Sequence, residues 1–298
     1  MERIAFDDIA VSTKTFTAST NLQIDLRLLF DALPVTPYAA PTRKRGRKKR
    51  KDETEDQTEL PQGSIITLKY ENKLRGVDLK SSKPKEKQKW FRNSFTVVIV
   101  LDKHINFKIC RNGTFQMTGC KRDEHARLCV SYIWSYIKDR TDVYSFTRGN
   151  KIEALFVPAM RNIDFTLGFL VDREKLARYM STQTEFHCLL ETSFGYTGVN
   201  IKIPLTNDIT DMNITRMHIE EELLVVEELP YQAYLDVLSP KDRQSKLTTE
   251  RYNTFLVFHS GKVIMSGITD DLMRNTYSTF LDIIAKCHRQ IEEKLEPA

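Results

Sequence analysis

Hydrophobic and polar residues alternate through residues 105–119 and again through residues 254–267, and each stretch is interrupted by a glycine, Gly113 or Gly261. Alternation with a period of two is typical of a β-strand, and a short glycine-containing segment between two such runs is typical of a hairpin turn. The sequence therefore predicts two hairpins of the same design, whose turn glycines lie 148 residues apart.

Each predicted hairpin is followed by a segment that starts with acidic residues and continues with a helical pattern. The two segments begin at Asp123 and Asp270. In both, apolar residues recur at intervals of three and four, which places them on one face of a helix. These residues are Leu128, Tyr132, Ile133, Tyr136 and Ile137 in the first segment and Met273, Tyr277, Phe280, Leu281 and Ile284 in the second. We expect two long helices, each with one face to bury.

Two further pairs of segments extend the repeat. Residues 25–33 and 172–180 each predict a shorter helix with an aspartate near its start. The sequences LRGVDLK (residues 74–80) and YTGVNIK (residues 196–202) are also similar, and we call them the glycine–valine echoes. Their offset is 122 residues, which predicts about 26 extra residues before the second hairpin, including the acidic stretch of residues 219–230.

The four matches occur in the same order in both halves, which indicates an internally duplicated α+β fold. Each half is expected to contain a strand, a helix, several antiparallel strands and a long helix packed across the sheet. The first repeat would occupy residues 1–150, with a disordered basic insertion at about 36–63. The second would occupy residues 151–298, with an acidic insertion at about 205–251, and a second lysine-rich loop is expected at residues 80–94.

Composition favours a folded, soluble protein of the cell interior. Hydrophobic residues make up 41% of 298 residues, which can supply a sizeable core. The longest apolar runs are short and the N-terminus is acidic, so neither a membrane span nor a secretory signal is expected. The five cysteines contain no CxxC pair, which argues against a zinc cluster and a disulfide framework. We expect a reducing intracellular compartment: the nucleus or a cytoplasmic viral factory, with packaging in the virion as a further location.

The positive net charge is concentrated in one short segment. The chain carries a net charge of +5, but eight of the nine residues from Arg43 to Lys51 are basic, so the remainder is near −3. The basic residues of this arm are Arg43, Lys44, Arg45, Arg47, Lys48, Lys49, Arg50 and Lys51. Such a run is typical of a solvated loop, of a nuclear localisation signal, or of an arm attracted to phosphates, and the three readings remain open.

The hairpins resemble a known family. LVFHSGKVIMSG (residues 256–267) resembles the strand, turn and strand of the second repeat of the TATA-box-binding protein family, and FKICRNGTFQMTGCK (residues 107–121) resembles those of the first. IDLRLLF (residues 24–30) is similar to the family's first helix, and RNI (residues 161–163) is similar to the start of its second repeat. The basic and acidic insertions resemble those of the divergent TATA-binding-like proteins of large nucleocytoplasmic DNA viruses.

This resemblance implies a saddle-like, curved antiparallel sheet with helices on its convex face and an uncovered concave face. The family lays the concave face on the minor groove of A/T-rich double-stranded DNA and bends the duplex. The groove floor at A·T pairs presents only acceptors, so short donors and flat apolar side chains can approach it closely. The resemblance therefore implies a transcription initiation factor without cofactor or metal, which recruits transcription factors or RNA polymerase subunits through its helical face.

The resemblance also implies site residues. The family inserts two phenylalanines per repeat as wedges, and the matching positions are Phe258 and Tyr196 in the second repeat and Cys110 and Leu74 in the first, with Phe95 and Phe194 as nearby alternatives. Cys110 departs from the family pattern. By strand alternation Phe115, Met117, Val263 and Met265 are expected on the core face. The predicted groove contacts are Asn162, Thr13, Gln116, Thr118, Ile264, Ser266, Leu256 and Lys108.

No catalytic motif is present, and we expect no enzyme. The six histidines do not stand in HExxH or a metal-spaced pair, and neither a GxSxG elbow nor a P-loop occurs. Cys120 with Asp123, Glu124 and His125 is interpreted as a helix entry. Two alternatives to a promoter-binding factor remain: a protein-interaction module of a transcription complex with weak or no DNA binding, suggested by Cys110, Lys108 and the acidic insertion, and a nucleic-acid enzyme, which would need a further catalytic group.

Overall fold

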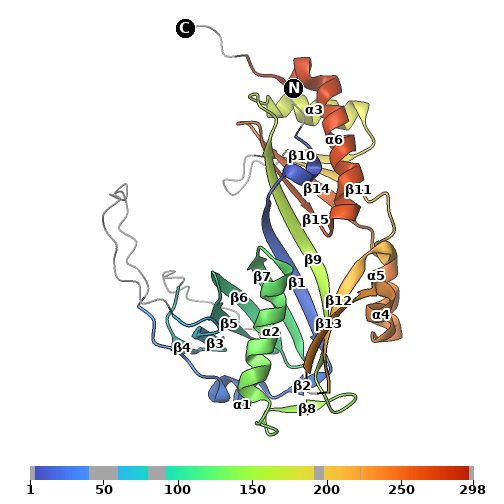
Figure 1. The fold of residues 1–298 in the computed structure, drawn as a ribbon. Helices are drawn as coiled ribbons and strands as arrows, with labels where there is room; N and C mark the ends of the chain where they lie inside the picture. The colour runs from blue at the N-terminus through green and yellow to red at the C-terminus, as the bar shows by residue number, and fades with distance from the viewer. Residues whose placement is uncertain (1–3, 40–59, 80–91, 191–197, 222, 295–298) are drawn as a thin grey trace. The chain divides into compact units, whose positions relative to one another are not determined.

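The computed structural model describes residues 4–39, 60–79, 92–190, 198–221 and 223–294 (Figure 1). The chain divides into two compact units. The first-repeat unit contains residues 16–156 and 217–225, and the second-repeat unit contains residues 1–15, 157–216 and 226–298. This division differs in three places from the expected one at residue 150, because residues 1–15 belong with the second repeat, whereas residues 151–156 and 217–225 belong with the first.

The first-repeat unit contains strands in the order β1, β7, β6, β5, β3 and β4, and every pairing from β7 to β4 is antiparallel. Helices α1 (Leu26–Ala32) and α2 (Asp123–Ile137) accompany them, and β2 (Leu22–Ile24) pairs with β8 (Tyr144–Phe146). The strand bounds are β1 Val11–Thr20, β3 Ile65–Tyr70, β4 Lys73–Gly76, β5 Ser94–Val100, β6 His104–Cys110 and β7 Thr114–Cys120.

The second-repeat unit contains the antiparallel order β10, β11, β14, β15 and β9. Its bounds are β9 Glu153–Thr166, β10 His187–Leu190, β11 Gly198–Pro204, β14 Tyr252–Phe258 and β15 Lys262–Gly267. The helices are α3 (Arg173–Gln183) and α6 (Asp270–Ile291), and 3-10 turns form at Phe6–Asp8 and Ile209–Asp211. The insertion adds β12 (Asn213–Glu220), β13 (Leu223–Pro230), α4 (Tyr231–Asp236) and α5 (Pro240–Thr248).

Each unit buries the apolar side of its sheet against its helices. In the first-repeat unit Phe107, Phe115 and Met117 lie in one cluster with Cys129, Val130 and Ile133 of α2. In the second-repeat unit Val263, Met265 and Phe255 lie with Met273, Phe280 and Ile284 of α6, and the rings of Phe255 and Phe280 stack at 4.2 Å. The expected core positions Phe115, Met117, Val263 and Met265 are all at most 1% exposed, so the predicted strand alternation is confirmed.

The shorter helices begin where the sequence predicts. Asp25 caps α1, because its carboxylate accepts from the N–H groups of Arg27 and Leu28 at 2.9 and 3.0 Å. Asp172 caps α3 by accepting from the N–H of Lys175 at 3.0 Å. These bonds satisfy amide groups that the first turn of a helix leaves without intrahelical partners. The same residue type thus starts the first helix of both repeats.

Main-chain hydrogen bonds repeat between the units. The N–H of Thr20 donates to Gly113 O at 3.2 Å, and the N–H of Leu167 donates to Gly261 O at 2.9 Å. Likewise Ile24 donates to Arg111 O and Val171 to His259 O, both at 2.8 Å. At the far end of each long helix, Asp25 donates to Val143 O at 2.9 Å and Asp172 to Ile291 O at 2.8 Å. The duplication is therefore present in the backbone of both units.

The two hairpin turns require glycine. Gly113 has φ 71° and Gly261 has φ 77°, in the left-handed region that L-residues rarely adopt. A Cβ on Gly113 would lie 2.2 Å from Leu22 O, and one on Gly261 would lie 2.1 Å from Phe169 O. The chain that follows the first strand of each repeat thus passes directly against its hairpin turn.

The glycine–valine echoes are not structurally equivalent, so that alignment was wrong. Gly198 begins β11, which pairs with hairpin strand β14. The strand in the same relation to β6 is β5, not β4, since β4 pairs with β3 at the other end of the unit. Residues 205–251 separate β11 from β14, whereas residues 101–103 separate β5 from β6, so the insertion exceeds the 26 residues estimated from the echoes.

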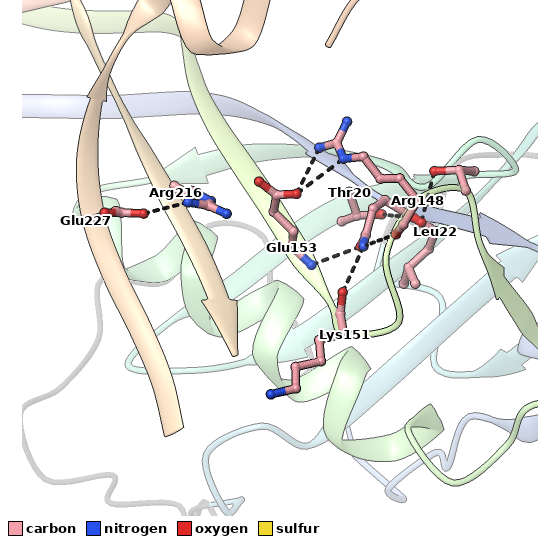
Figure 2. A network of polar contacts seen from close by, with 9 residues as sticks. Thr20, Leu22, Arg148, Lys151, Glu153, Arg216 and Glu227 are labelled. Atoms are coloured by element: carbon pink, nitrogen blue, oxygen red, sulfur yellow. Dashed lines mark hydrogen bonds and ion pairs between the residues drawn. The ribbon is translucent and has the colours of Figure 1, made fainter. Parts of the chain in front are cut away.

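The insertion forms a β-hairpin followed by two helices. Arg216 on β12 and Glu227 on β13 face each other across the hairpin and form an ion pair at 3.0 Å (Figure 2). Met217 is 1% exposed in the core of the first-repeat unit, where its sulfur accepts from the Ser131 hydroxyl of α2 at 3.4 Å. Met217 of the inserted hairpin is therefore part of the first-repeat core.

A second polar network closes the first-repeat unit where β1 ends. The buried Asn21 side chain donates to Arg148 O at 2.9 Å and to Lys151 O at 2.8 Å, and it accepts from the N–H of Glu153 at 2.9 Å. Arg148 in turn forms an ion pair with Glu153 at 3.1 Å (Figure 2). These bonds fix the connection from β8 to β9 against β1.

Candidate nucleic-acid interface

The side of the second-repeat sheet opposite the helices carries the predicted groove residues. Strand pairing places Ser266 opposite Asn162 and Thr254, and Ile264 opposite Leu256 and Asp164. Because facing residues of adjacent strands share a side, these residues lie together. Asn162, Leu256, Ile264 and Ser266 are all half-buried. Phe258 is opposite Gly198 on the same side and is also half-buried.

The corresponding side of the first-repeat sheet is more polar. Thr118 lies opposite Asn106, and Gln116 lies opposite Lys108, which in turn faces Thr96. Cys110 lies opposite Ser94 at the end of the same strand pair. Gln116 and Thr118 are exposed and Lys108 and Cys110 are half-buried. The structure thus brings four predicted residues together on one side of β6 and β7.

Each of these two sides is hollowed beside its hairpin turn. The apolar hollow, of about 590 Å³, is in the second-repeat unit and is lined by Phe258, Lys262 and Ile264 together with Asp8, Ile9, Ala10, Asp164, Phe165, Thr166, Val263 and Ile4. The polar hollow, of about 670 Å³, is in the first-repeat unit and is lined by Cys110, Thr114 and Gln116 together with Gln23, Asn93, Ser94, Lys108, Arg111 and Asn112. Cys110, Thr114 and Gln116 occupy the hairpin positions that Phe258, Lys262 and Ile264 occupy in the second repeat.

The charges around the two hollows differ. Lys108 and Arg111 line the polar hollow, whereas Asp8 and Asp164 accompany Lys262 at the apolar hollow. Burial raises the pKa of the Cys110 thiol above its ordinary value, and the charge of Lys108 lowers it by a smaller amount. The thiol is therefore protonated and uncharged near neutral pH, because its pKa lies above the ordinary value near 9.

Of the two residues predicted as outer wedges, Leu74 is placed differently from the expectation. Leu74 is 46% exposed on β4, where it lies opposite Lys69, and two strands separate it from Cys110. Phe95, the alternative, is 1% exposed in the core. Counting two residues back from the equivalent positions Gly198 and Ser94 gives Tyr196 and Arg92. Tyr196 and Phe194 lie outside the described residues, and so does the basic arm from Arg43 to Lys51.

The first strands of both repeats meet within the second-repeat unit. The hydroxyl of Ser12 donates to Asn162 O at 3.2 Å, which joins β1 to β9 beside the predicted residues Thr13 and Asn162. Thr13 is half-buried. The side-chain Oδ1 of Asn162 is buried without a hydrogen-bond partner.

Several residues on these sides were missed by sequence reasoning. Asn200 lies opposite Leu256, Thr254 opposite Ser266, and Asn106 opposite Thr118. Asn200 resembles Asn162 in having a buried Oδ1 without a partner. Their only sequence signal was the strand period counted outward from the hairpins, which identifies the side once the neighbouring strand is known.

The constellation around His125 is structural. The His125 ring is fully buried; its Nδ1 accepts from the N–H of Lys121 at 3.3 Å and its Nε2 lies 2.9 Å from Asp102. The Nδ1 bond holds the start of α2, whereas Nε2 lies close to the Asp102 carboxylate without hydrogen-bond geometry. Across the described residues, no group of three or more histidine, cysteine, aspartate or glutamate side chains is placed to hold a metal ion. Within the same residues no helix has both the length and the apolar character needed to cross a membrane.

Two antiparallel α+β units of repeated design, with helices on one side of each sheet, define a TATA-box-binding-protein-like fold. No protein-family model matches the chain. It is similar to "TATA-box-binding protein-like" of Acanthamoeba polyphaga mimivirus, with 29% identity over 171 residues that are 48% of this chain and 47% of that protein. This similarity confirms the resemblance inferred from the hairpins.

A second relative extends further along the chain. "Uncharacterized protein 335L" of Invertebrate iridescent virus 6 is 28% identical over 205 residues, which are 65% of this chain and 60% of that protein. The chain thus spans 60% and 47% of the lengths of these two relatives. Among solved structures, Methanococcus jannaschii TBP aligns with 93% of this chain and 98% of its own, at 12% identity and a TM-score of 0.46.

Proposed function

We propose that the chain binds A/T-rich double-stranded DNA through the sheet sides opposite its helices and bends the duplex during transcription initiation. The observation that carries the proposal is the half-buried Phe258 beside the apolar hollow, on the same sheet side as Leu256, Ile264 and Ser266. An apolar ring at the edge of such a surface can enter a base step and replace the stacking that is lost there. Short polar side chains beside it suit the acceptors of the A·T groove floor.

Partners other than DNA belong to the same proposal. We expect transcription factors or RNA polymerase subunits to bind the solvent sides of α2 and α6, whose opposite sides are buried in the two cores. The basic arm would add phosphate contacts without sequence preference. It would act alongside the sheet, because the charges at the apolar hollow include both Asp164 and Lys262 and supply little net attraction.

A duplex-binding and bending assay tests this function. The full chain is titrated with an A/T-rich duplex and a G/C-rich duplex of the same length, and the distance between dyes on the two DNA ends reports the bend. We expect tighter binding and a larger bend with A/T-rich DNA. Equal affinity for both sequences with no bend would contradict the proposal. Absence of duplex binding, with retained binding to transcription proteins, would favour the interaction module, for which the acidic residues Asp8 and Asp164 at the apolar hollow are the specific observation.

A further inference from the structure

The two hollows use equivalent backbone positions but differ in chemistry. Where the second repeat has Phe258, Lys262 and Ile264, the first repeat has Cys110, Thr114 and Gln116. The cysteine side chain is too short and too narrow to fill an opened base step, which is the task of a wedge. A different ligand group must therefore be considered for the polar hollow.

The second wedge position of the first repeat also lacks an aromatic ring. Strand pairing makes Ser94 equivalent to Gly198, because Ser94 faces Cys110 as Gly198 faces Phe258. Two residues earlier the second repeat has Tyr196, and the first repeat has Arg92, which is exposed. Both wedge positions of the first repeat are thus occupied by residues that cannot stack as a phenylalanine does.

The polar hollow is lined by hydrogen-bond donors. Lys108 and Arg111 contribute positive charge, and Ser94, Asn93, Asn112, Thr114 and Gln116 contribute hydroxyl and amide groups. None of its described lining residues is acidic. The Cys110 thiol adds no negative charge near neutral pH, since burial raises its pKa. Two cationic side chains and several neutral donors, with no carboxylate among the described lining residues, suit a phosphate group.

We propose that the polar hollow beside Cys110 holds a backbone phosphate of the duplex, so that the second repeat alone wedges the DNA. This inference rests on the proposed function and specifies how its two halves differ. A protein with one wedge and one phosphate site distinguishes the two ends of its DNA site. It therefore binds an asymmetric promoter in one orientation, which two identical halves would not do.

Measuring base stacking at individual base-pair steps of the DNA tests the inference. A/T-rich duplexes carry 2-aminopurine at one position each, moved step by step along the site, and its fluorescence rises where stacking is lost. We expect a rise at one step with the full chain and its loss with Phe258→Ala. Cys110→Phe should create a second fluorescent step. A rise at two separated steps with the unmodified chain would overturn the inference.

The phosphate is tested by the salt dependence of binding. The double variant Lys108→Gln and Arg111→Gln should weaken duplex binding and reduce the slope of log affinity against log salt by about 1, as expected for the loss of one phosphate contact. Lys138→Gln, an exposed lysine at the end of α2 in the same unit, is the matched control and should leave the slope unchanged. An unchanged slope in the double variant would overturn the phosphate site.

The outcomes separate this inference from the proposed function. If the unmodified chain binds no duplex, the proposed function fails, and the inference fails with it. If it binds and bends DNA but unstacks two steps, only the inference fails. Thermal unfolding of each variant verifies folding, and because the lysine and arginine side chains at the hollow lie outside the buried core, the salt measurement remains decisive even where Cys110→Phe does not fold.

Discussion

The apolar hollow at Phe258 and the polar hollow at Cys110 lie beside two hairpins of equivalent design. Each hairpin has a glycine turn, and equivalent main-chain hydrogen bonds join it to the neighbouring chain. The backbone of each hairpin depends on main-chain hydrogen bonds and on one glycine per turn, whereas the lining positions that differ between the repeats are half-buried or exposed: Cys110 and Phe258, Thr114 and Lys262, and Gln116 and Ile264. The two copies therefore retain one architecture and differ in the chemistry they present.

The largest expected effect is on the hairpin backbone that the two repeats share. Gly261→Ala and Gly113→Ala should each lower the free energy of unfolding by at least about 1–3 kcal/mol, because both add backbone strain and a clash with a carbonyl oxygen. Gly149→Ala is the matched control: φ is 64° there but a Cβ would meet nothing within 4 Å, so we expect a smaller loss. Chemical denaturation measures all three. If only one of the two hairpin variants lowered the free energy of unfolding, the two hairpins would not be structurally equivalent.

The next largest effect is on the linings. Phe258→Ala should weaken binding to A/T-rich duplex about 10- to 100-fold and reduce the bend, because stacking on an aromatic ring contributes about 1–3 kcal/mol per base. Cys110→Ala should change neither. Leu247→Ala, which truncates an exposed apolar residue of α5, controls for general loss of apolar surface. A gel shift and the dye distance measure both properties. Equal losses for Phe258→Ala and Cys110→Ala would mean that the repeats do not differ in this role.

A third prediction concerns the basic arm, whose positive charge belongs to neither hollow. Deletion of residues 43–51 should weaken binding to all duplexes by a similar factor, about tenfold at moderate salt, and flatten the salt dependence, because phosphate contacts do not depend on sequence. The measurement is affinity for A/T-rich and G/C-rich duplexes across a salt series. A loss confined to A/T-rich sites would assign the arm to sequence recognition instead.

The smallest effect is expected where the N-terminal segment borders the apolar hollow. Asp7 accepts two hydrogen bonds from Arg274 at 2.7 Å, and this arginine lowers the pKa of the carboxyl group. Because the folded-state pKa is lowered, the contact stabilises the segment above the ordinary value near 3.8 and is lost as pH falls through the lowered value.

Asp7→Asn should therefore speed amide hydrogen exchange in residues 4–10 slightly near neutral pH, with the difference from the unmodified chain vanishing in strong acid. Asp31→Asn, on an exposed carboxylate of α1 in the first-repeat unit, is the control. A difference that persists at low pH would show that the variant acts through something other than the lost charge.

Much of the fold could be predicted because local patterns and tertiary contacts agree. The hairpins at Gly113 and Gly261 and the caps at Asp25 and Asp172 are specified by nearby residues, so a single sequence reveals them. The equivalence of Gly76 and Gly198 failed because a glycine followed by valine fits many strands. Only the pairing partner distinguishes β4 from β5, and pairing between distant segments leaves no local signal.

The sequence predicted which side of the sheet a residue occupies only for residues close to the hairpin turns. Residues up to five positions from the turn glycine, such as Phe258 and Ser266, could be assigned to a sheet side by counting. Asn200 and Arg92 could not, because their significance depends on which strand lies beside the hairpin. Nothing in the sequence indicated that residues 4–10 would line the apolar hollow, since their contacts with α6 join segments separated by most of the chain.

That last contact has a consequence for how the protein is made. Phe6 packs edge-on against Tyr277 at 5.4 Å, and the Tyr277 hydroxyl donates to Ile4 O at 2.8 Å. During translation the earliest of these residues leave the ribosome long before the helix that receives them. The second-repeat unit can complete its core only after synthesis has passed residue 277, and until then its opening segment is available to chaperones or to mispairing.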